Sequence, residues 1–417
     1  MTNAVDLNIT LNKEKYYSGT SSQMAYMLIE TSAISENFSS RSPVNLCLVM
    51  DRSASMKGDK LDNVKIAMLN IVETMNEKDF ISVIVFNEDA DVVIKSQPVE
   101  NKENLKYLIN DISYSGGTSI SKGIELGLKE LDRNYSENHV NRMLILTDGQ
   151  TYGDEEICYK LARKANETGI SITALGVGDE WHEEVLDTIA HENSGKSDYI
   201  ATPDEIIPIF ESEMKSIQSI ITKNNEMKLR FVEGVTPRKI NRVLPYISEI
   251  EFEFISDNTV QFDMGDMDQN FGHGFLLELV IEAKKSGQYR IAQAEYSFEI
   301  LDKKSTKSSI RKDIVVNFSD DEIACKKINP TVMNIAEKAS AYELQTRAIK
   351  QAAAGDISGA TQRLRIAATR LLDMGENDLA DAALDEINNL ENAGSMSSSG
   401  TKKLKYETRK LTQRLSL

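Results

Sequence analysis

Residues 43–55 read PVNLCLVMDRSAS, a mainly apolar strand followed at once by three oxygen-bearing side chains. Asp51, Ser53 and Ser55 stand two residues apart, so an extended loop at the strand end can aim all three side chains at one point. Carboxylate and hydroxyl oxygens are the ligands that a hard cation such as Mg²⁺ prefers. The stretch therefore predicts a buried strand that ends in a candidate metal site.

Two later segments extend this pattern. Residues 116–119 read GGTS and precede an apolar-patterned helix, so they predict a tight turn that presents the hydroxyl of Thr118 on a loop. Residues 143–146 form a second apolar strand, which Thr147, Asp148 and Gly149 follow directly. Two buried strands that each end in an aspartate, with a Gly-Gly-Thr loop between them, are a far rarer combination than any one motif.

This combination resembles the von Willebrand factor A domain family and its metal-ion-dependent adhesion site. The resemblance implies that the metal ligands are Asp51, Ser53, Ser55, Thr118 and Asp148. In that family one or both aspartates contact the ion through water, so the ion keeps an exchangeable position that a carboxylate of another protein can fill. The expected cofactor is a divalent cation, with Mg²⁺ as the first choice and Mn²⁺ or Ca²⁺ as alternatives.

Strands and helices alternate between residues 42 and 222, which predicts a doubly wound α/β domain. Residues 226–320 instead show several apolar runs with a period of two, which is typical of an all-β domain. Residues 1–40 contain two short strands and cannot form a domain alone. We therefore expect these N-terminal strands to join the second unit, so that the A domain is an insertion in a β-sandwich.

The C-terminal part of the chain is predicted to be helical. Residues 330–392 are rich in Ala and Leu, and Gly355-Asp356 recurs 20 residues later as Gly375-Glu376, which favours a helical hairpin or bundle. Residues 393–417 read as a flexible linker, GSMSSSG at 394–400, followed by a basic tail. The basic side chains of this tail are Lys402, Lys403, Lys405, Arg409, Lys410 and Arg414.

Composition excludes several classes of protein. The formal net charge of −17 argues against nucleic acid as the main partner, because phosphate binding needs a clustered positive field. The sequence has no run of about 18 apolar residues and no basic segment followed by an apolar core at its N-terminus, so neither a membrane span nor a secretory signal is expected. The three cysteines lie far apart and form no C-x-x-C pair, which argues against a disulfide framework. Because neither a membrane span nor a secretory signal is expected, we expect a cytoplasmic protein.

The resemblance implies a non-enzymatic adaptor or scaffold that captures a partner's Asp or Glu through the metal ion. Bacterial chains that this sequence resembles are associated with protein kinase, phosphatase and AAA+ ATPase systems, so a partner from such a system is expected. Two alternatives remain open at this point. One is a constitutive structural subunit of a larger assembly, and the other is a metal-dependent phosphoester hydrolase.

A hydrolase would need a general base or a second metal near the first, and only Asp59, Asp154 and Asp179 are loosely placed for that role. The sequence has neither the G-x-S-x-G motif of a serine hydrolase nor the H-E-x-x-H motif of a zinc hydrolase. Residues 176–178, Gly-Val-Gly, lack the third glycine of a dinucleotide-binding loop. We therefore expect no catalytic residues and no nucleotide cofactor.

Overall fold

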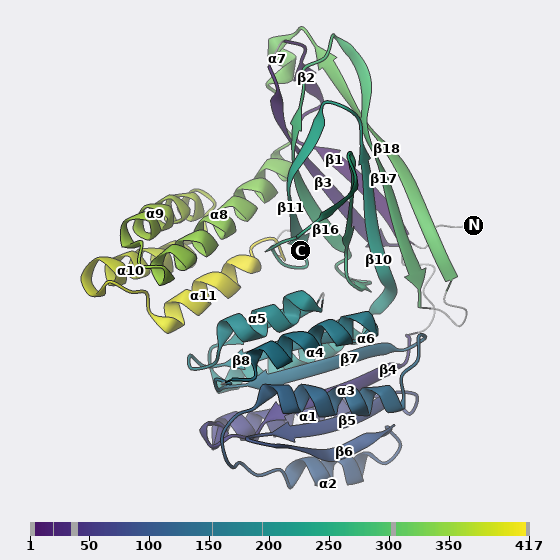
Figure 1. The fold of residues 1–417 in the computed structure, drawn as a ribbon, viewed down its shortest axis with the longest axis vertical. Helices are drawn as coiled ribbons and strands as arrows, with labels where there is room; N and C mark the ends of the chain where they lie inside the picture. Colours follow the sequence, from purple (N-terminus) through teal and green to yellow (C-terminus); the bar gives the residue numbers. More distant parts are fainter. Residues whose placement is uncertain are drawn as a thin grey trace. The chain divides into compact units, whose positions relative to one another are not determined.

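The computed structural model describes residues 5–19, 21–34, 41–151, 153–193, 195–301 and 306–413, and the chain divides into two compact units (Figure 1). Unit 2 consists of Ser40–Ile221 with Leu301–Thr306. Unit 1 consists of Met1–Ser39, Thr222–Ile300 and Lys307–Leu417. The predicted class is confirmed, because an α/β unit is inserted in a β-sheet unit that continues into C-terminal helices.

Unit 2 is built on a six-stranded sheet with the order β6-β5-β4-β7-β8-β9. Every neighbouring pair is parallel except β5 and β6, which are antiparallel. All eight residues of the central strand β4 are buried, since helices cover both faces of the sheet and a strand in that position needs no polar face. The strands are β4 (Val44–Asp51), β5 (Phe80–Phe86), β6 (Ala90–Pro98), β7 (Val140–Thr147), β8 (Ser171–Val177) and β9 (Lys196–Ile200).

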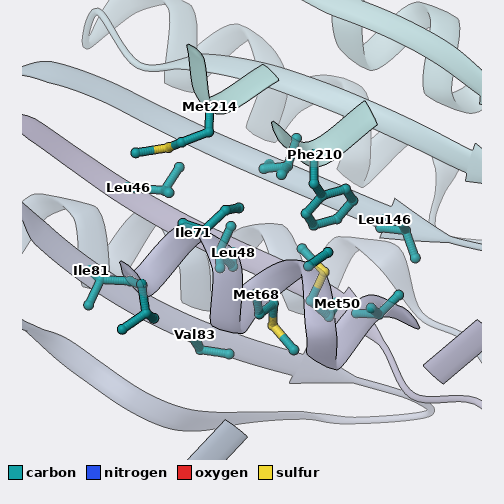
Figure 2. Packing of buried hydrophobic residues seen from close by; sticks show 14 of the residues in the cluster. Leu46, Leu48, Met50, Met68, Ile71, Ile81, Val83, Leu146, Phe210 and Met214 are labelled. Carbon is teal, nitrogen blue, oxygen red and sulfur yellow. The ribbon is translucent and has the colours of Figure 1, made fainter. Parts of the chain in front are cut away.

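The helices of unit 2 are α1 (Asp59–Thr74), α2 (Lys102–Asn110), α3 (Ile120–Arg133), α4 (Glu155–Glu167), α5 (Glu183–Glu192) and α6 (Ile206–Gln218). Figure 2 shows how α1 and α6 bury one face of the sheet, with Leu48 of β4 packed among Met68 of α1 and Phe210 of α6. Helix α3 covers the other face. A Cβ atom at Gly123 would lie 2.8 Å from Cγ1 of Val49, so only glycine lets α3 approach β4 this closely.

Unit 1 contains two sheets. The first has the order β1-β3-β16-β11-β12, and the second has the order β13-β14-β10-β17-β18-β2, with β15 paired to β10. The rings of Phe262 and Phe275, one from each sheet, lie 5.1 Å apart and join the two sheets. The strands are β1 (Val5–Leu11), β2 (Lys15–Tyr17), β3 (Gln23–Ala33), β10 (Ile220–Phe231), β11 (Val235–Leu244), β12 (Ser248–Glu249), β13 (Glu253–Ser256), β14 (Thr259–Asp263), β15 (Met267–Asp268), β16 (His273–Ile281), β17 (Gly287–Ile300) and β18 (Thr306–Ser319).

The C-terminal helices pack on the first of these sheets. Val332 and Ala339 of α8 share one apolar cluster with Leu28 of β3 and Leu276 of β16. Gly355 and Gly375, which the sequence repeat singles out, have positive φ angles and connect successive helices. Among the described residues, no helix is long and apolar enough to cross a membrane. The helices are α7 (Glu322–Cys325), α8 (Pro330–Ala353), α9 (Ile357–Asp373), α10 (Asn377–Ala393) and α11 (Ser398–Arg409).

The structure differs from the predicted flexible linker at residues 394–400. Gly394 ends α10 with a left-handed φ of 72°, and α11 begins only a few residues later at Ser398. The backbone N–H and the hydroxyl of Ser397 donate to the Glu386 carboxylate at 2.7 and 2.6 Å. The predicted basic tail is therefore largely a packed helix, in which Lys402 is buried, while Arg414 lies outside the described residues.

We expect Glu386→Ala to destabilise unit 1 by about 1–3 kcal/mol, because it removes the buried carboxylate that accepts from the backbone N–H and the hydroxyl of the half-buried Ser397. Chemical denaturation of the full chain, followed through the transition of unit 1, measures this loss. Glu391→Ala is the matched control, since Glu391 lies in the same helix and its ion pair with Arg365 is exposed to solvent. Equal effects of the two substitutions would contradict this account of the connection between α10 and α11.

Candidate metal site at the strand ends of unit 2

The candidate site lies where the strand order of unit 2 reverses direction. The chain leaves β4 toward β5 on one side, whereas β7 lies on the other side of β4. In open α/β sheets a crevice forms at this switch point, outside the carboxyl ends of the strands. Asp51 ends β4, and Asp148 directly follows β7, so the fold brings both aspartates to this place.

Asp51 is completely buried and held by its own loop. One carboxylate oxygen accepts a hydrogen bond from the backbone N–H of Ser53 at 2.7 Å, and the other accepts from the Thr147 hydroxyl at 2.6 Å. Burial raises the pKa of Asp51 to about 6; the hydrogen bonds from Thr147 and Ser53 oppose this shift, and the nearby Asp148 carboxylate adds to it. The position is therefore costly for a carboxylate with no cation beside it.

A chain of hydrogen bonds joins Ser53, Ser55 and Asp148. The hydroxyl oxygens of Ser53 and Ser55 are 2.9 Å apart, and the Ser55 hydroxyl donates to Oδ1 of Asp148 at 2.7 Å. Ser53 and Asp148 are buried, whereas Ser55 is exposed. The cluster is thus anchored in the protein and reaches solvent at Ser55.

The loop that carries Thr118 is fastened to the loop after β4. The backbone N–H of Ser115 donates to the Arg52 carbonyl at 2.8 Å, and the backbone N–H of Ala54 donates to the Gly116 carbonyl at 3.1 Å. Gly149 makes room for the Thr118 hydroxyl, since a Cβ atom at that position would lie only 2.9 Å from Oγ1. These contacts place Thr118 beside the residue that follows Asp148.

Two of the three acids considered for a hydrolase, Asp154 and Asp179, have other partners. Oδ2 of Asp154 accepts from the hydroxyl of Ser119 and the backbone N–H of Ser121, both at 3.0 Å. Burial acts to raise the pKa of Asp154, but hydrogen bonds from Ser121, Thr151 and Ser119 outweigh it and lower the pKa. Asp154 therefore organises the start of α3. Asp179 accepts from the Tyr199 hydroxyl at 2.8 Å, and Asp59 lies exposed in the first turn of α1.

Two residues that contact the aspartates are absent from the sequence-based prediction. Thr147 holds Asp51, as described above, and Lys60 of α1 places its Nζ 2.5 Å from Oδ2 of Asp148. Thr147 could have been predicted as a site residue from the sequence, because it directly precedes Asp148 at a strand end. Nothing in the sequence pattern connects Lys60 with an aspartate 88 residues away.

Gly176 and Gly178 both contact the indole of Trp181, the first by leaving space for the ring and the second through its carbonyl oxygen. The indole of Trp181 lies so close over β8 that a Cβ atom at Gly176 would be 2.1 Å from Cε2 of the ring. Nε1 of Trp181 donates to the Gly178 carbonyl at 2.7 Å, and the ring is 2% exposed. Gly176 therefore gives the indole its place against the sheet.

The five predicted ligands fit a hard divalent cation by their chemistry. They offer only oxygen atoms, two carboxylates and three hydroxyls, and Ser53, Ser55 and Asp148 already bond to one another around one point. The ammonium group of Lys60 is a cation held by one of these carboxylates. In the described part of the chain, this site included, no three His, Cys, Asp or Glu residues gather in a way that could hold a metal ion, so an ion here would depend on the three hydroxyl groups as well as on the two carboxylates.

Comparison with known proteins identifies the inserted unit. Residues 45–211 match the family model of the von Willebrand factor type A domain. This unit is a von Willebrand factor type A domain. The A domain thus accounts for nearly all of unit 2, and residues 330–414 match a second model, the Sll0103-like C-terminal alpha-helical domain. That second match extends past α11, so the helix at Ser398–Arg409 lies within the matched region.

Similar proteins share the whole architecture. The Synechocystis protein sll0103 is 28% identical over 377 residues, which cover 87% of this chain and 87% of that protein. A solved structure of a von Willebrand factor type A protein from Catenulispora acidiphila superimposes with a TM-score of 0.79 at 16% identity and covers 98% of each chain. The ArnB paralog VWA2 from Sulfolobus acidocaldarius gives a TM-score of 0.58 at 15% identity, with 98% of this chain and 99% of that chain covered. These likenesses concern the fold alone.

Proposed function

We propose that the A domain binds a divalent cation, Mg²⁺ before Mn²⁺ or Ca²⁺, through Asp51, Ser53, Ser55, Thr118 and Asp148, and captures a carboxylate of a partner protein through that ion. The observation that carries the proposal is the bonded chain Ser53–Ser55–Asp148 at the switch point of the sheet. A divalent ion would replace these internal hydrogen bonds with bonds to the metal. Because the ligand set holds only two carboxylates, the bound ion keeps the electrophilic character needed to attract another one.

The charge of the chain makes the ion necessary for this capture. A protein with a net charge of −17 repels an acidic partner at long range, and a carboxylate also loses hydration on binding. The ion supplies the local positive centre that offsets both effects. Von Willebrand factor type A domains generally mediate metal-dependent protein interactions, and the same role is the one we propose for this domain.

We infer an adaptor or scaffold in preference to an enzyme. Asp154 and Asp179, which could have served as general bases, are bound by hydroxyl and backbone groups of their own domain. The partner that we propose belongs to a protein kinase, phosphatase or AAA+ ATPase system. We place the interaction in the cytoplasm, a proposal that the three free and buried cysteines support.

Affinity purification tests the proposal. Tagged full-length chain is incubated with lysate in Mg²⁺ or in EDTA, and the captured proteins are identified by mass spectrometry. We expect at least one partner to be retained in Mg²⁺ and lost both in EDTA and with Thr118→Ala, because Thr118 lies on a half-buried loop whose truncation removes a ligand without removing core packing.

Thr168→Ala is the matched control, since that exposed threonine only donates to carbonyls at the end of α4. The Thr168→Ala variant should capture the same set of proteins as the wild type. Partners that stay bound in EDTA and with Thr118→Ala would refute ion-dependent capture and would favour a constitutive subunit of an assembly.

A further inference from the structure

Lys60 sits in the first turn of α1 and reaches back across the strand ends. Its Nζ lies 2.5 Å from Oδ2 of Asp148, and a Cβ atom added at Gly178, which directly follows β8, would lie 4.0 Å from this Nζ. The side chain of Asp148 is fully buried, whereas that of Lys60 is 30% exposed. A buried carboxylate is thus paired with a cation that has a direct path to solvent.

Both carboxylate oxygens of Asp148 have a hydrogen-bond donor from the same chain. Oδ1 accepts from the Ser55 hydroxyl, and Oδ2 accepts from the Lys60 ammonium group. Both oxygens of a predicted metal ligand are therefore engaged by groups of the same chain. A cation that binds at Ser53, Ser55 and Asp148 must compete with the ammonium group for this carboxylate.

The competition follows from charge. Asp51 and Asp148 bring two formal negative charges, and Lys60 already offsets one of them. A divalent ion beside Asp148 would repel an ammonium group in contact with the same carboxylate, and this repulsion is strong because the site is buried. The ammonium group of Lys60 can instead move into water at little cost in free energy, because the side chain is partly exposed.

We propose that Lys60 is a built-in competitor of the divalent cation: it neutralises Asp148 when the ion is absent and must release it when the ion binds. Lys60 thereby weakens the affinity for the ion and keeps the domain stable without it. This inference rests on the proposed metal-dependent function and adds to it a residue that sets the ion concentration at which capture begins. An ion-binding site without such a competitor would load at lower concentrations.

Isothermal titration of the full chain with MgCl₂ tests this inference, with Lys60→Gln as the main variant. The glutamine amide can still donate to Asp148, so the fold is retained while the charge is lost. We expect Lys60→Gln to bind Mg²⁺ about tenfold more tightly than wild type, because no ammonium group has to leave the Asp148 carboxylate when the ion binds. Lys60→Arg, which keeps the charge, should bind like wild type.

Lys65→Gln is the matched control, because Lys65 lies on the same helix and donates to the Asn110 carbonyl, away from the aspartates. Its Mg²⁺ affinity should not change. A thermal melt in EDTA gives a second readout: Lys60→Met, which cannot bond to Asp148, should unfold at a lower temperature than wild type, and Mg²⁺ should restore it.

The outcomes separate the two proposals. If wild type binds Mg²⁺ and Lys60→Gln binds it equally or more weakly, the competitor role is overturned and ion-dependent capture still stands. If Lys60→Gln binds Mg²⁺ and wild type binds it only at much higher concentrations, the competitor role is supported. If neither protein binds the ion, both proposals fall.

Discussion

Asp51→Asn should reduce the Mg²⁺ affinity of the A domain at least about 100-fold, which corresponds to roughly 2.8 kcal/mol of binding free energy. Asp51 provides one of only two carboxylates in the predicted ligand set, so its neutralisation removes half of the negative charge that holds the ion. The effect should be visible as loss of heat in a titration with MgCl₂ and as loss of Mg²⁺-dependent partner capture.

The same variant should fold normally. Oδ1 of an asparagine can accept from the backbone N–H of Ser53, and its amide group can donate to the Thr147 hydroxyl oxygen, which is the donor in the wild type. The asparagine also places no charge in this fully buried position. In EDTA we therefore expect a melting temperature equal to or above that of wild type. Asp91→Asn is the control, because Asp91 is exposed and pairs only with the side chain of Arg52 near the same loop. Unchanged Mg²⁺ binding by Asp51→Asn would exclude Asp51 as a ligand.

Gly176→Ala should destabilise the A domain by about 3 kcal/mol or more, since it adds a methyl group where the structure has no space for one. The added Cβ would lie 2.1 Å from the indole of Trp181, which is buried and bonded through Nε1 to the Gly178 carbonyl. The indole cannot move without giving up that bond and its packing. Chemical denaturation, followed by the fluorescence of this single tryptophan, measures the loss.

Gly153→Ala provides the comparison. Gly153 has a φ of +80° but no atom within 4 Å of the added Cβ, so only the backbone conformation is penalised, by roughly 1 kcal/mol. The difference between the two alanine variants isolates the contact with the indole. Equal losses would mean that Trp181 tolerates the methyl group and that Gly176 has no packing role.

Much of the fold could be predicted because the strands of a covered parallel sheet are continuous apolar runs. Residues 45–50 and 80–86 lie within strands of the structure, and both are bounded by polar segments. The aspartates at 51 and 148 could be located for the same reason, since each directly follows such a run. That these residues bind a metal ion stays a prediction.

The local sequence pattern does not predict β11, although this strand pairs along much of its length with β16. The strand contains Pro237 and buries Asn241 and Arg242, which do not fit the usual pattern of a strand. Arg242 donates from Nη1 to the Tyr246 hydroxyl and from Nη2 to the Met264 carbonyl, and its guanidinium lies over the ring of Phe275. These partners come from later in the chain, so local patterns cannot reveal them.

Residues 394–400 depart from their local pattern for a related reason. A run of Ser and Gly is typical of a linker, but here Ser397 begins a helix because a buried acid from the preceding helix binds it. Lys60 shows the same limitation at the site. A lysine in the first turn of a helix usually points into water, and only the fold places a buried aspartate within its reach.

The insertion of the A domain also constrains the order in which the protein can assemble during synthesis. Met27 of β3 pairs with Leu277 of β16, and the entire A domain is translated between them. A domain generally folds once its own part of the chain has left the ribosome. The A domain can therefore fold while β3 still lacks β16 as its neighbour. Until β16 is synthesised, the edge of β3 that faces away from β1 lacks its partner strand and is open to pairing with another chain.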